Sequence, residues 1–172
     1  MGARRSGTTT VTVNREQRHI YVLPEDDANR QLANGFLQQV EWNKQRWLRV
    51  LPVARGWRSV LELFVSAHVA EMDRWPLRFM VLLIDFDDDF DARLQEVKGF
   101  IPAHLTERVF VLGALSDPEA LTRADLGSFE AIGSAMADDC REGTNETWGK
   151  PLLQHNAGEL DRLRQQACSI LF

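Results

Sequence analysis

Two kinds of hydrophobic pattern alternate along the chain. Short apolar runs without glycine or proline, rich in β-branched and aromatic residues, are typical of buried strands; they lie at 19–23, 47–51, 78–84 and 108–112. Between them, apolar residues recur every three to four positions, which is the spacing of one helical face; these stretches lie at 26–42, 57–73 and 90–97. The pattern therefore predicts strands and helices in alternation.

This alternation predicts an α/β fold. The run 79–84 has six consecutive apolar residues, which is typical of a central strand covered on both faces. Beyond it and the strand that follows, the pattern is helical only, with a helix start at Pro118 and helices at 128–141 and 157–170. We therefore expect a mainly parallel sheet of about four strands, helices on both faces, and a helical C-terminal region over 116–172.

The length of 172 residues is that of one domain. Hydrophobic residues make up 44% and charged residues 26%, which is ordinary globular usage and excludes disorder, collagen-like repeats and a coiled coil as descriptions of the whole. Residues 1–17 are polar and include a threonine run, so we expect a loose lead-in there. Residues 18–172 are expected to form a single α/β domain.

Cysteine spacing and hydropathy bear on metal sites, disulfides and cellular location. Cys140 and Cys168 are the two cysteines, and they lack the spacing of a four-thiolate zinc site or a disulfide framework, so we expect two reduced thiols. No apolar run follows Arg4 and Arg5, as a secretory signal would require. The longest apolar run is far short of the roughly 20 residues of a membrane span. We therefore expect a cytoplasmic protein without a membrane segment.

Net charge excludes one simple mode of action. The chain has 25 acidic and 20 basic residues, a net charge of -5, which argues against an unaided electrostatic clamp on duplex DNA. Much of the acidity follows predicted strands, at 25–27 after the first and at 85–91 after the third. Acidic groups in those places are compatible with a site that needs a cation.

Glu25, Asp85 and Asp87 are the strongest candidates for chemistry. Sites in open α/β sheets form outside the carboxyl ends of the strands, where these residues are expected. On a continuing strand, Asp85 and Asp87 would point to one face. Carboxylates held so close repel one another unless a proton or cation lies between them, and Mg2+ prefers oxygen ligands. The plainer alternative is a solvated loop in which Asp88 or Asp89 caps the next helix.

The spacing of these acids resembles the TOPRIM domain, a Rossmann-like fold of topoisomerases, bacterial primases, OLD-family nucleases and small stand-alone nucleases. A glutamate directly follows the first strand, in the segment 19–27, and a DxD closes a hydrophobic strand, in the segment 79–87. The resemblance covers roughly residues 18–115. It departs from the family at Asp26, where many members have glycine, and at Pro24 before the glutamate.

The resemblance implies a metal-dependent nuclease. Asp85 and Asp87 would bind Mg2+ or Mn2+, and Glu25 would share in metal binding or act as general base on the attacking water. Lys150 would match the late basic residue that stabilises the transition state in OLD-type nucleases, and His155 is a further catalytic candidate unless His155 and Asn156 belong to the cap of the last helix. Since the one tyrosine, Tyr21, lies inside the first strand, no tyrosine is free for a topoisomerase reaction.

Substrate and partners follow from the same resemblance and from one basic stretch. DNA is expected as the substrate in preference to RNA. Small TOPRIM nucleases of phage defence are often paired with an ATPase subunit, so such a partner is expected here. Whether the chain also forms a homo-oligomer is left open by the sequence. Residues 44–58 carry Trp47 and Trp57 among five basic side chains, which can stack single-stranded bases or pack against a partner. Arg93 is expected to pair with Asp89 or to reach a phosphate.

Two other functions remain open on the sequence alone. In a HAD-like phosphohydrolase, Asp85 would be an aspartyl nucleophile and Asp138 and Asp139 would hold Mg2+. The DxD strand would normally come first in that fold, whereas two strands precede it here. In a non-catalytic TOPRIM-fold subunit, the domain would only bind a partner such as an ATPase.

Overall fold

A computed structural model describes residues 14–124 and 126–172, so most of the expected lead-in lies outside the described residues. The described chain forms four strands: β1 His19–Pro24, β2 Leu48–Val50, β3 Arg78–Leu83 and β4 Val109–Leu112. Its α-helices are α1 Asp27–Gln39, α2 Trp57–Leu63, α3 Val69–Arg74, α4 Phe90–Gly99, α5 Glu119–Arg123, α6 Phe129–Glu142, α7 Ala157–Leu163 and α8 Ser169–Leu171. Every predicted strand is therefore present within a residue or two of its expected bounds.

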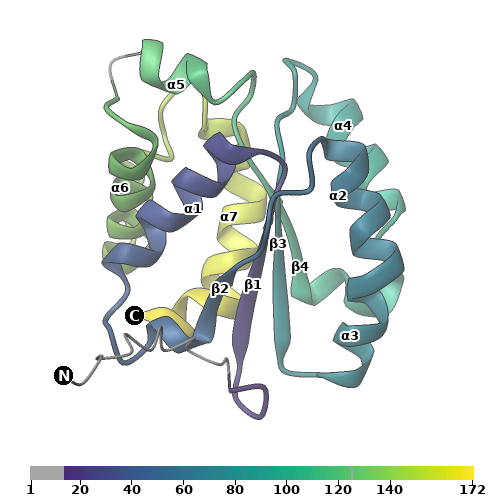
Figure 1. Ribbon diagram of the computed structural model, residues 1–172. Helices are drawn as coiled ribbons and strands as arrows, with labels where there is room; N and C mark the ends of the chain where they lie inside the picture. The colour runs from purple at the N-terminus through teal and green to yellow at the C-terminus, as the bar shows by residue number, and fades with distance from the viewer. Residues whose placement is uncertain (1–13, 125) are drawn as a thin grey trace, which may run out of the picture.

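The four strands form one parallel sheet in the order β2-β1-β3-β4 (Figure 1). In this sheet the last residue of β1, Pro24, lies opposite Leu83, the last residue of β3, and Leu83 lies opposite Leu112 of β4. The register therefore brings the ends of three strands to one edge. The predicted α/β class, the parallel sheet and the helical C-terminal region are confirmed.

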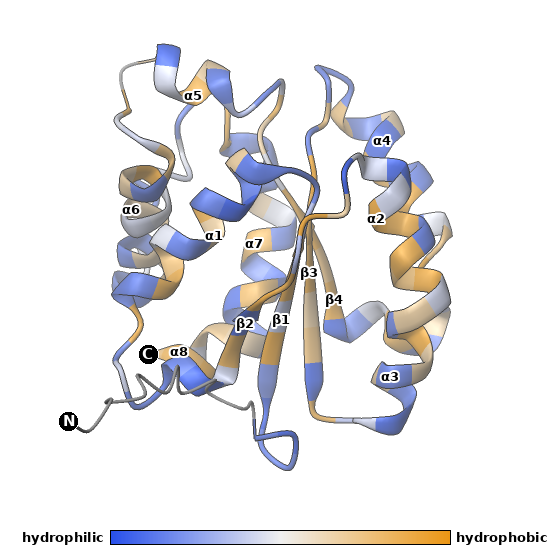
Figure 2. Cartoon of the chain, viewed as in Figure 1, coloured by the Kyte–Doolittle hydropathy of each residue, from blue (hydrophilic) through white to orange (hydrophobic). Residues whose placement is uncertain are grey.

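Helices cover both faces of the sheet, with α1, α6 and α7 on one side and α2, α3 and α4 on the other (Figure 1). Alternate residues of β1 and β3 enter two separate cores: Ile20, Val22 and Val81 pack on the first side, Leu23 and Leu82 on the second. The strands are accordingly hydrophobic along most of their length (Figure 2). Burial on both faces explains why the 79–84 run is uniformly apolar.

The two long helices of the first face are unusually close. A Cβ at Gly35 of α1 would lie 2.1 Å from the Glu130 carbonyl oxygen, and a Cβ at Gly133 of α6 would lie 2.0 Å from the Leu32 carbonyl oxygen. Ser134 Oγ also donates to the Gly35 carbonyl oxygen at 3.1 Å. Glycine at both crossing points lets the two backbones touch, so α1 and α6 pack as a pair.

Two predicted helices contain a π-helical turn. The stretch predicted as one helix over 57–73 is α2, a π turn η2 (Phe64–His68) and α3; that predicted over 157–170 is α7, a π turn η5 (Arg164–Cys168) and α8. Short 3-10 turns precede β2, β4 and α7: η1 Gln45–Trp47, η3 Ala103–Arg108 and η4 Gln154–Asn156. None of the helices in the described ranges is long and apolar enough to cross a membrane.

Candidate active site

Glu25 and Asp85 lie in direct contact at the carboxyl edge of the sheet. Glu25 follows β1 and donates its backbone N–H to the Leu83 carbonyl oxygen at 2.9 Å, which extends the β1–β3 ladder by one residue. The backbone N–H of Asp85 then donates to Glu25 Oε2 at 2.8 Å. Two acids sixty positions apart in the sequence are thus joined because β1 and β3 are parallel neighbours.

Asn29 ties Asp85 to the start of α1. Its Nδ2 donates to Asp85 Oδ1 at 3.1 Å and to Asp26 Oδ1 at 3.2 Å, and its backbone N–H donates to the same Asp26 oxygen at 2.9 Å. Asp26 is therefore the N-cap of α1. Asn29 was not among the sequence candidates. Its position three residues after the N-cap Asp26 is the signal that could have found it, because this places its side chain near the end of β1.

The pKa values reflect this crowding of acids. Burial raises the pKa of Asp85 to about 7; the hydrogen bond from Asn29 opposes the rise, and the charges of Glu25, Asp26 and Asp87 add to it. Burial also raises the pKa of Glu25, against the hydrogen bond from the Asp85 backbone. Asp85 is only 8% exposed. The site therefore concentrates negative charge that a proton or a cation would neutralise.

Asp87 does not share one strand face with Asp85, contrary to the geometry expected of a continuing strand. β3 ends at Leu83, and the chain leaves it through a turn in which Asp87 and Asp88 have φ angles of 49° and 62°. Phe86, which lies between Asp85 and Asp87 in the sequence, is fully buried, whereas Asp87 is exposed. The left-handed turn makes Asp87 a loop residue that can approach the site only from its solvent side.

Arg93 of α4 holds this turn. One guanidinium nitrogen donates to the Asp85 carbonyl oxygen at 3.0 Å, and the other pairs with Asp87 Oδ2 at 3.1 Å. The guanidinium also stacks on the ring of Trp57, 4.0 Å from its centroid. The expected pair of Arg93 with Asp89 is therefore wrong, because the turn brings Asp87 within reach. Asp89 precedes α4 without a side-chain capping bond.

His155 and Asn156 support the site from behind. Asn156 Nδ2 donates to the Gly113 carbonyl oxygen at 2.9 Å, and its Oδ1 accepts the Gly113 N–H at 3.1 Å, so the expected side-chain cap on the last helix is wrong. His155 Nε2 lies 2.8 Å from the same carbonyl oxygen, and its ring packs edge-on against Phe86 and Phe90. These contacts position the loop that carries Asp85, and the other ring nitrogen of His155, Nδ1, is buried without a hydrogen-bond partner in the described ranges.

Lys150 lies on an exposed turn near the same edge. The turn meets the end of β4 where Leu115 N–H donates to the Leu152 carbonyl oxygen at 3.0 Å, and Asp88 N–H in turn donates to the Leu115 carbonyl oxygen at 2.7 Å. Within residues 14–124 and 126–172, the Lys150 side chain has no hydrogen bond or ion pair. Two backbone hydrogen bonds therefore connect the Lys150 turn to the loop that carries Asp87 and Asp88, and the Lys150 ammonium group has no partner among the described residues.

The basic, aromatic stretch 44–58 is divided between two ends of the sheet. Trp47 precedes β2, at the edge opposite the acids, and Trp42 is 86% exposed before it. Trp57 follows β2, where Arg55 N–H donates to the Glu25 carbonyl oxygen at 2.7 Å. The stretch is therefore not one surface, and only its last four residues, from Arg55 onward, adjoin the acids.

The second acidic pair, Asp138 and Asp139, has a structural role. Asp138 pairs with Arg141 on the surface of α6. Both oxygens of Asp139 are used: Oδ1 accepts from Thr144 Oγ1 at 2.6 Å and Glu146 N–H at 3.1 Å, and Oδ2 accepts from the N–H groups of the next two residues, Thr147 and Trp148, at 2.7 and 3.0 Å. A carboxylate saturated by four donors is not free to hold the Mg2+ of a HAD-like enzyme.

The donors at the acidic edge fit a hard cation in their chemistry. Glu25, Asp26 and Asp85 supply carboxylate oxygens, and the buried Oδ1 of Asn29 has no hydrogen-bond partner in the described chain. In those same ranges, no three or more His, Cys, Asp or Glu side chains are already gathered as a set of metal ligands. An ion would therefore have to draw the side chains together, and Asp87 would have to leave Arg93 to join them.

No protein-family model matches this chain, and no curated protein or solved structure matches it. The proposed function therefore rests on the site and on the resemblance of its acids to the TOPRIM pattern.

Proposed function

We propose that this protein is a Mg2+- or Mn2+-dependent nuclease with a TOPRIM-like fold. The observation that carries the proposal is the contact between Glu25 and the buried Asp85, which come from two neighbouring parallel strands and are joined by Asn29 to Asp26. Holding carboxylates beside one another out of water is costly, and such groups cluster at functional sites, where a proton or a cation offsets their charge.

Each residue has a role in this proposal. When bound, the divalent ion would lower the pKa of a coordinated water and neutralise charge on the scissile phosphate. Asp85 and Asp87 would hold the ion, and Asn29 would keep the Asp85 carboxylate in place. Glu25 would share in binding it or accept a proton from the attacking water, because burial raises its pKa towards the range of a general base. Lys150 remains the proposed cation for the transition state.

Trp57 is the proposed contact with the nucleic acid. Its ring lies under the guanidinium groups of Arg58 and Arg93, at 4.7 and 4.0 Å from the centroid. A guanidinium that moves off the ring would leave an aromatic face on which an unpaired base could stack, with an arginine beside it for the phosphate. We propose DNA as the substrate and, from the resemblance to small TOPRIM nucleases, an ATPase subunit of an antiviral system as the partner. A chain of net charge -5 needs help to hold DNA, which agrees with such a partner.

The test compares Glu25→Gln and Asp85→Asn with the matched exposed-acid variant Asp91→Asn. Cleavage of plasmid and single-stranded DNA is measured with Mg2+ or Mn2+, and Mn2+ binding is measured by calorimetry. Both site variants are expected to lose at least a hundredfold in cleavage rate and to weaken Mn2+ binding, while Asp91→Asn keeps both. Cleavage that persists in both site variants at the wild-type rate would refute the assignment.

A non-catalytic partner-binding subunit is the second candidate. Two observations favour it: Asp87 is already paired with Arg93, and no closed set of metal ligands is formed in the described ranges. It predicts that wild type binds no Mn2+ at millimolar concentration and cleaves no DNA, but forms a stable complex with its partner. Saturable Mn2+ binding that Asp85→Asn removes would exclude this candidate.

A further inference from the structure

Two cysteines that are remote in the sequence meet inside the molecule. Cys140 lies on α6 and Cys168 on the π turn η5, and their Sγ atoms are 3.4 Å apart. Both side chains are buried, each residue being 8% exposed. They are the only cysteines of the 172-residue chain. Two sulfur atoms at this separation are in contact, and a bond of about 2.05 Å requires them to approach by a little more than 1 Å.

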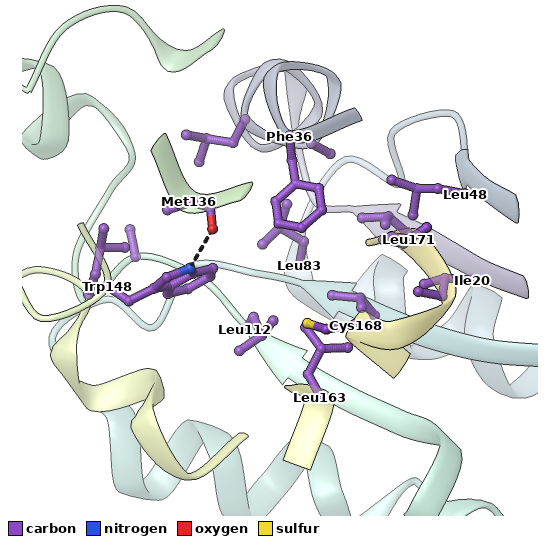
Figure 3. A pocket seen from close by; sticks show the side chains of 17 residues that line it. Ile20, Phe36, Leu48, Leu83, Leu112, Met136, Trp148, Leu163, Cys168 and Leu171 are labelled. Carbon is purple, nitrogen blue, oxygen red and sulfur yellow. Dashed lines mark hydrogen bonds between the residues drawn. The ribbon is translucent and has the colours of Figure 1, made fainter. Parts of the chain in front are cut away.

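The Cys168 side chain has free space beside it. Its sulfur lies at the wall of an apolar cavity of about 80 Å³ between the sheet and the helices of the first face, beside Leu112 and Leu163 (Figure 3). An empty volume next to the sulfur lets the side chain change rotamer without displacing a packed neighbour. Cys168 is also the last residue of the π turn η5, where the backbone departs from regular α-helix geometry.

The two thiols are electrostatically different. The Cys168 thiol donates to Cys140 Sγ, and this hydrogen bond lowers the pKa of Cys140, as does the nearby Arg164 guanidinium. The same contact and burial raise the pKa of Cys168. Arg164 is itself fixed, because it donates to Asn145 Oδ1 at 2.8 Å and to the carbonyl oxygens of Asp139 and Thr144. Cys140 is therefore the better nucleophile of the pair.

We propose that Cys140 and Cys168 are a redox-active pair that hydrogen peroxide converts to an intramolecular disulfide. Cys140 sulfur attacks one peroxide oxygen, the O–O bond breaks, and a sulfenic acid and one water result. Cys168 sulfur then attacks Cys140 sulfur, the S–O bond breaks, and the hydroxyl leaves as a second water with the Cys168 proton. Two thiols and one hydrogen peroxide thus give one disulfide and two waters.

The bond links α6 to the C-terminal helical segment. The loop that it closes contains Lys150, which lies on the exposed turn near the acidic edge, and His155 and Asn156, which support that edge from behind. Closing a loop of this length restricts the unfolded chain, so oxidation is expected to raise the thermal unfolding midpoint by roughly 5 to 10 °C. This consequence does not depend on nuclease activity.

The experiment exposes the purified full-length protein to hydrogen peroxide and follows intact mass, with peptide mapping after thiol blocking. Wild type is expected to lose two hydrogen atoms, to yield a Cys140–Cys168 linked peptide, and to return to the reduced mass with dithiothreitol. Cys168→Ser is expected to accumulate sulfenic acid at Cys140, trapped by dimedone, whereas Cys140→Ser forms neither product. Circular dichroism checks that each variant is folded.

Three results would overturn the proposal. In the first, both wild-type thiols remain free in excess peroxide and titrate fully after unfolding. In the second, Cys140 is overoxidised in wild type as fast as in Cys168→Ser, so that Cys168 does not resolve the sulfenic acid. In the third, the only disulfide joins two chains. None of these outcomes depends on metal binding or cleavage, so they are distinct from failure of the proposed nuclease.

Discussion

Asp85 and Asp139 are both buried carboxylates, but their surroundings are opposite. Asp139, 3% exposed, accepts four hydrogen bonds, and although burial acts to raise its pKa, these bonds hold that pKa below the ordinary value. Asp85 accepts one side-chain hydrogen bond among three other acids, and burial raises its pKa to about 7. The difference separates a carboxylate that stabilises the fold from one that the fold tolerates for another purpose.

The largest expected effect tests this difference directly. Asp139→Ala is expected to lower the free energy of unfolding by roughly 3 kcal/mol, because it leaves buried backbone donors without an acceptor. Asp85→Asn is expected to leave stability unchanged or to raise it by up to about 1 kcal/mol, because it removes repulsion and keeps an oxygen for Asn29. Urea unfolding at neutral pH without metal gives both values. Equal destabilisation by the two variants would remove the distinction.

A second prediction compares one asparagine side chain from each region. Asn29→Ala is expected to weaken Mn2+ binding by roughly 10- to 100-fold, because Asn29 orients Asp85. Asn145→Ala is the matched control: Asn145 accepts from Arg164 in the Asp139 region, so its loss is expected to lower stability slightly and leave Mn2+ affinity unchanged. Calorimetry with Mn2+ measures both. Weaker binding in the control would mean that the two regions are not independent.

The smallest expected effect is a pH dependence of Asp139. Because its pKa is lowered on folding, its ionised form stabilises the protein fully above the unfolded value of about 3.9, and this contribution is lost as pH falls through the lower folded pKa. The stability difference between wild type and Asp139→Ala is therefore expected to be constant near neutral pH and to shrink in acid. Urea midpoints between about pH 7 and pH 3 measure it; a gap that widens in acid would contradict the assignment.

Much of the fold was predictable because its determinants are local. The 79–84 run, buried on both faces, and the helical spacing at 57–73 required no knowledge of the partner elements. Parallel pairing then brought Glu25 beside Asp85, as their strand-end positions implied. Burial pattern and strand order were sufficient for these features.

The rest of the site depends on contacts that spacing does not encode. The left-handed turn at Asp87 and Asp88 redirects Arg93 to Asp87, and no glycine marks that turn in the sequence. Asn156 resembles a helix cap but bonds to Gly113 on the neighbouring strand end. The metal, the substrate and the partner stay predictions, since no relative and no bound group tests them.

The interlocked glycines of α1 and α6 set the boundary of the functional unit. Residues 18–115 carry Glu25, Asp85 and Asp87, so a fragment cut there keeps every residue of the motif. That fragment would lose α6, and with it the surface on which Gly35 rests. The helix that presents Asp26 and Asn29 would then have no rigid support on its far side. A transplant of this site into another scaffold must therefore include the C-terminal helices, although they carry none of the three acids.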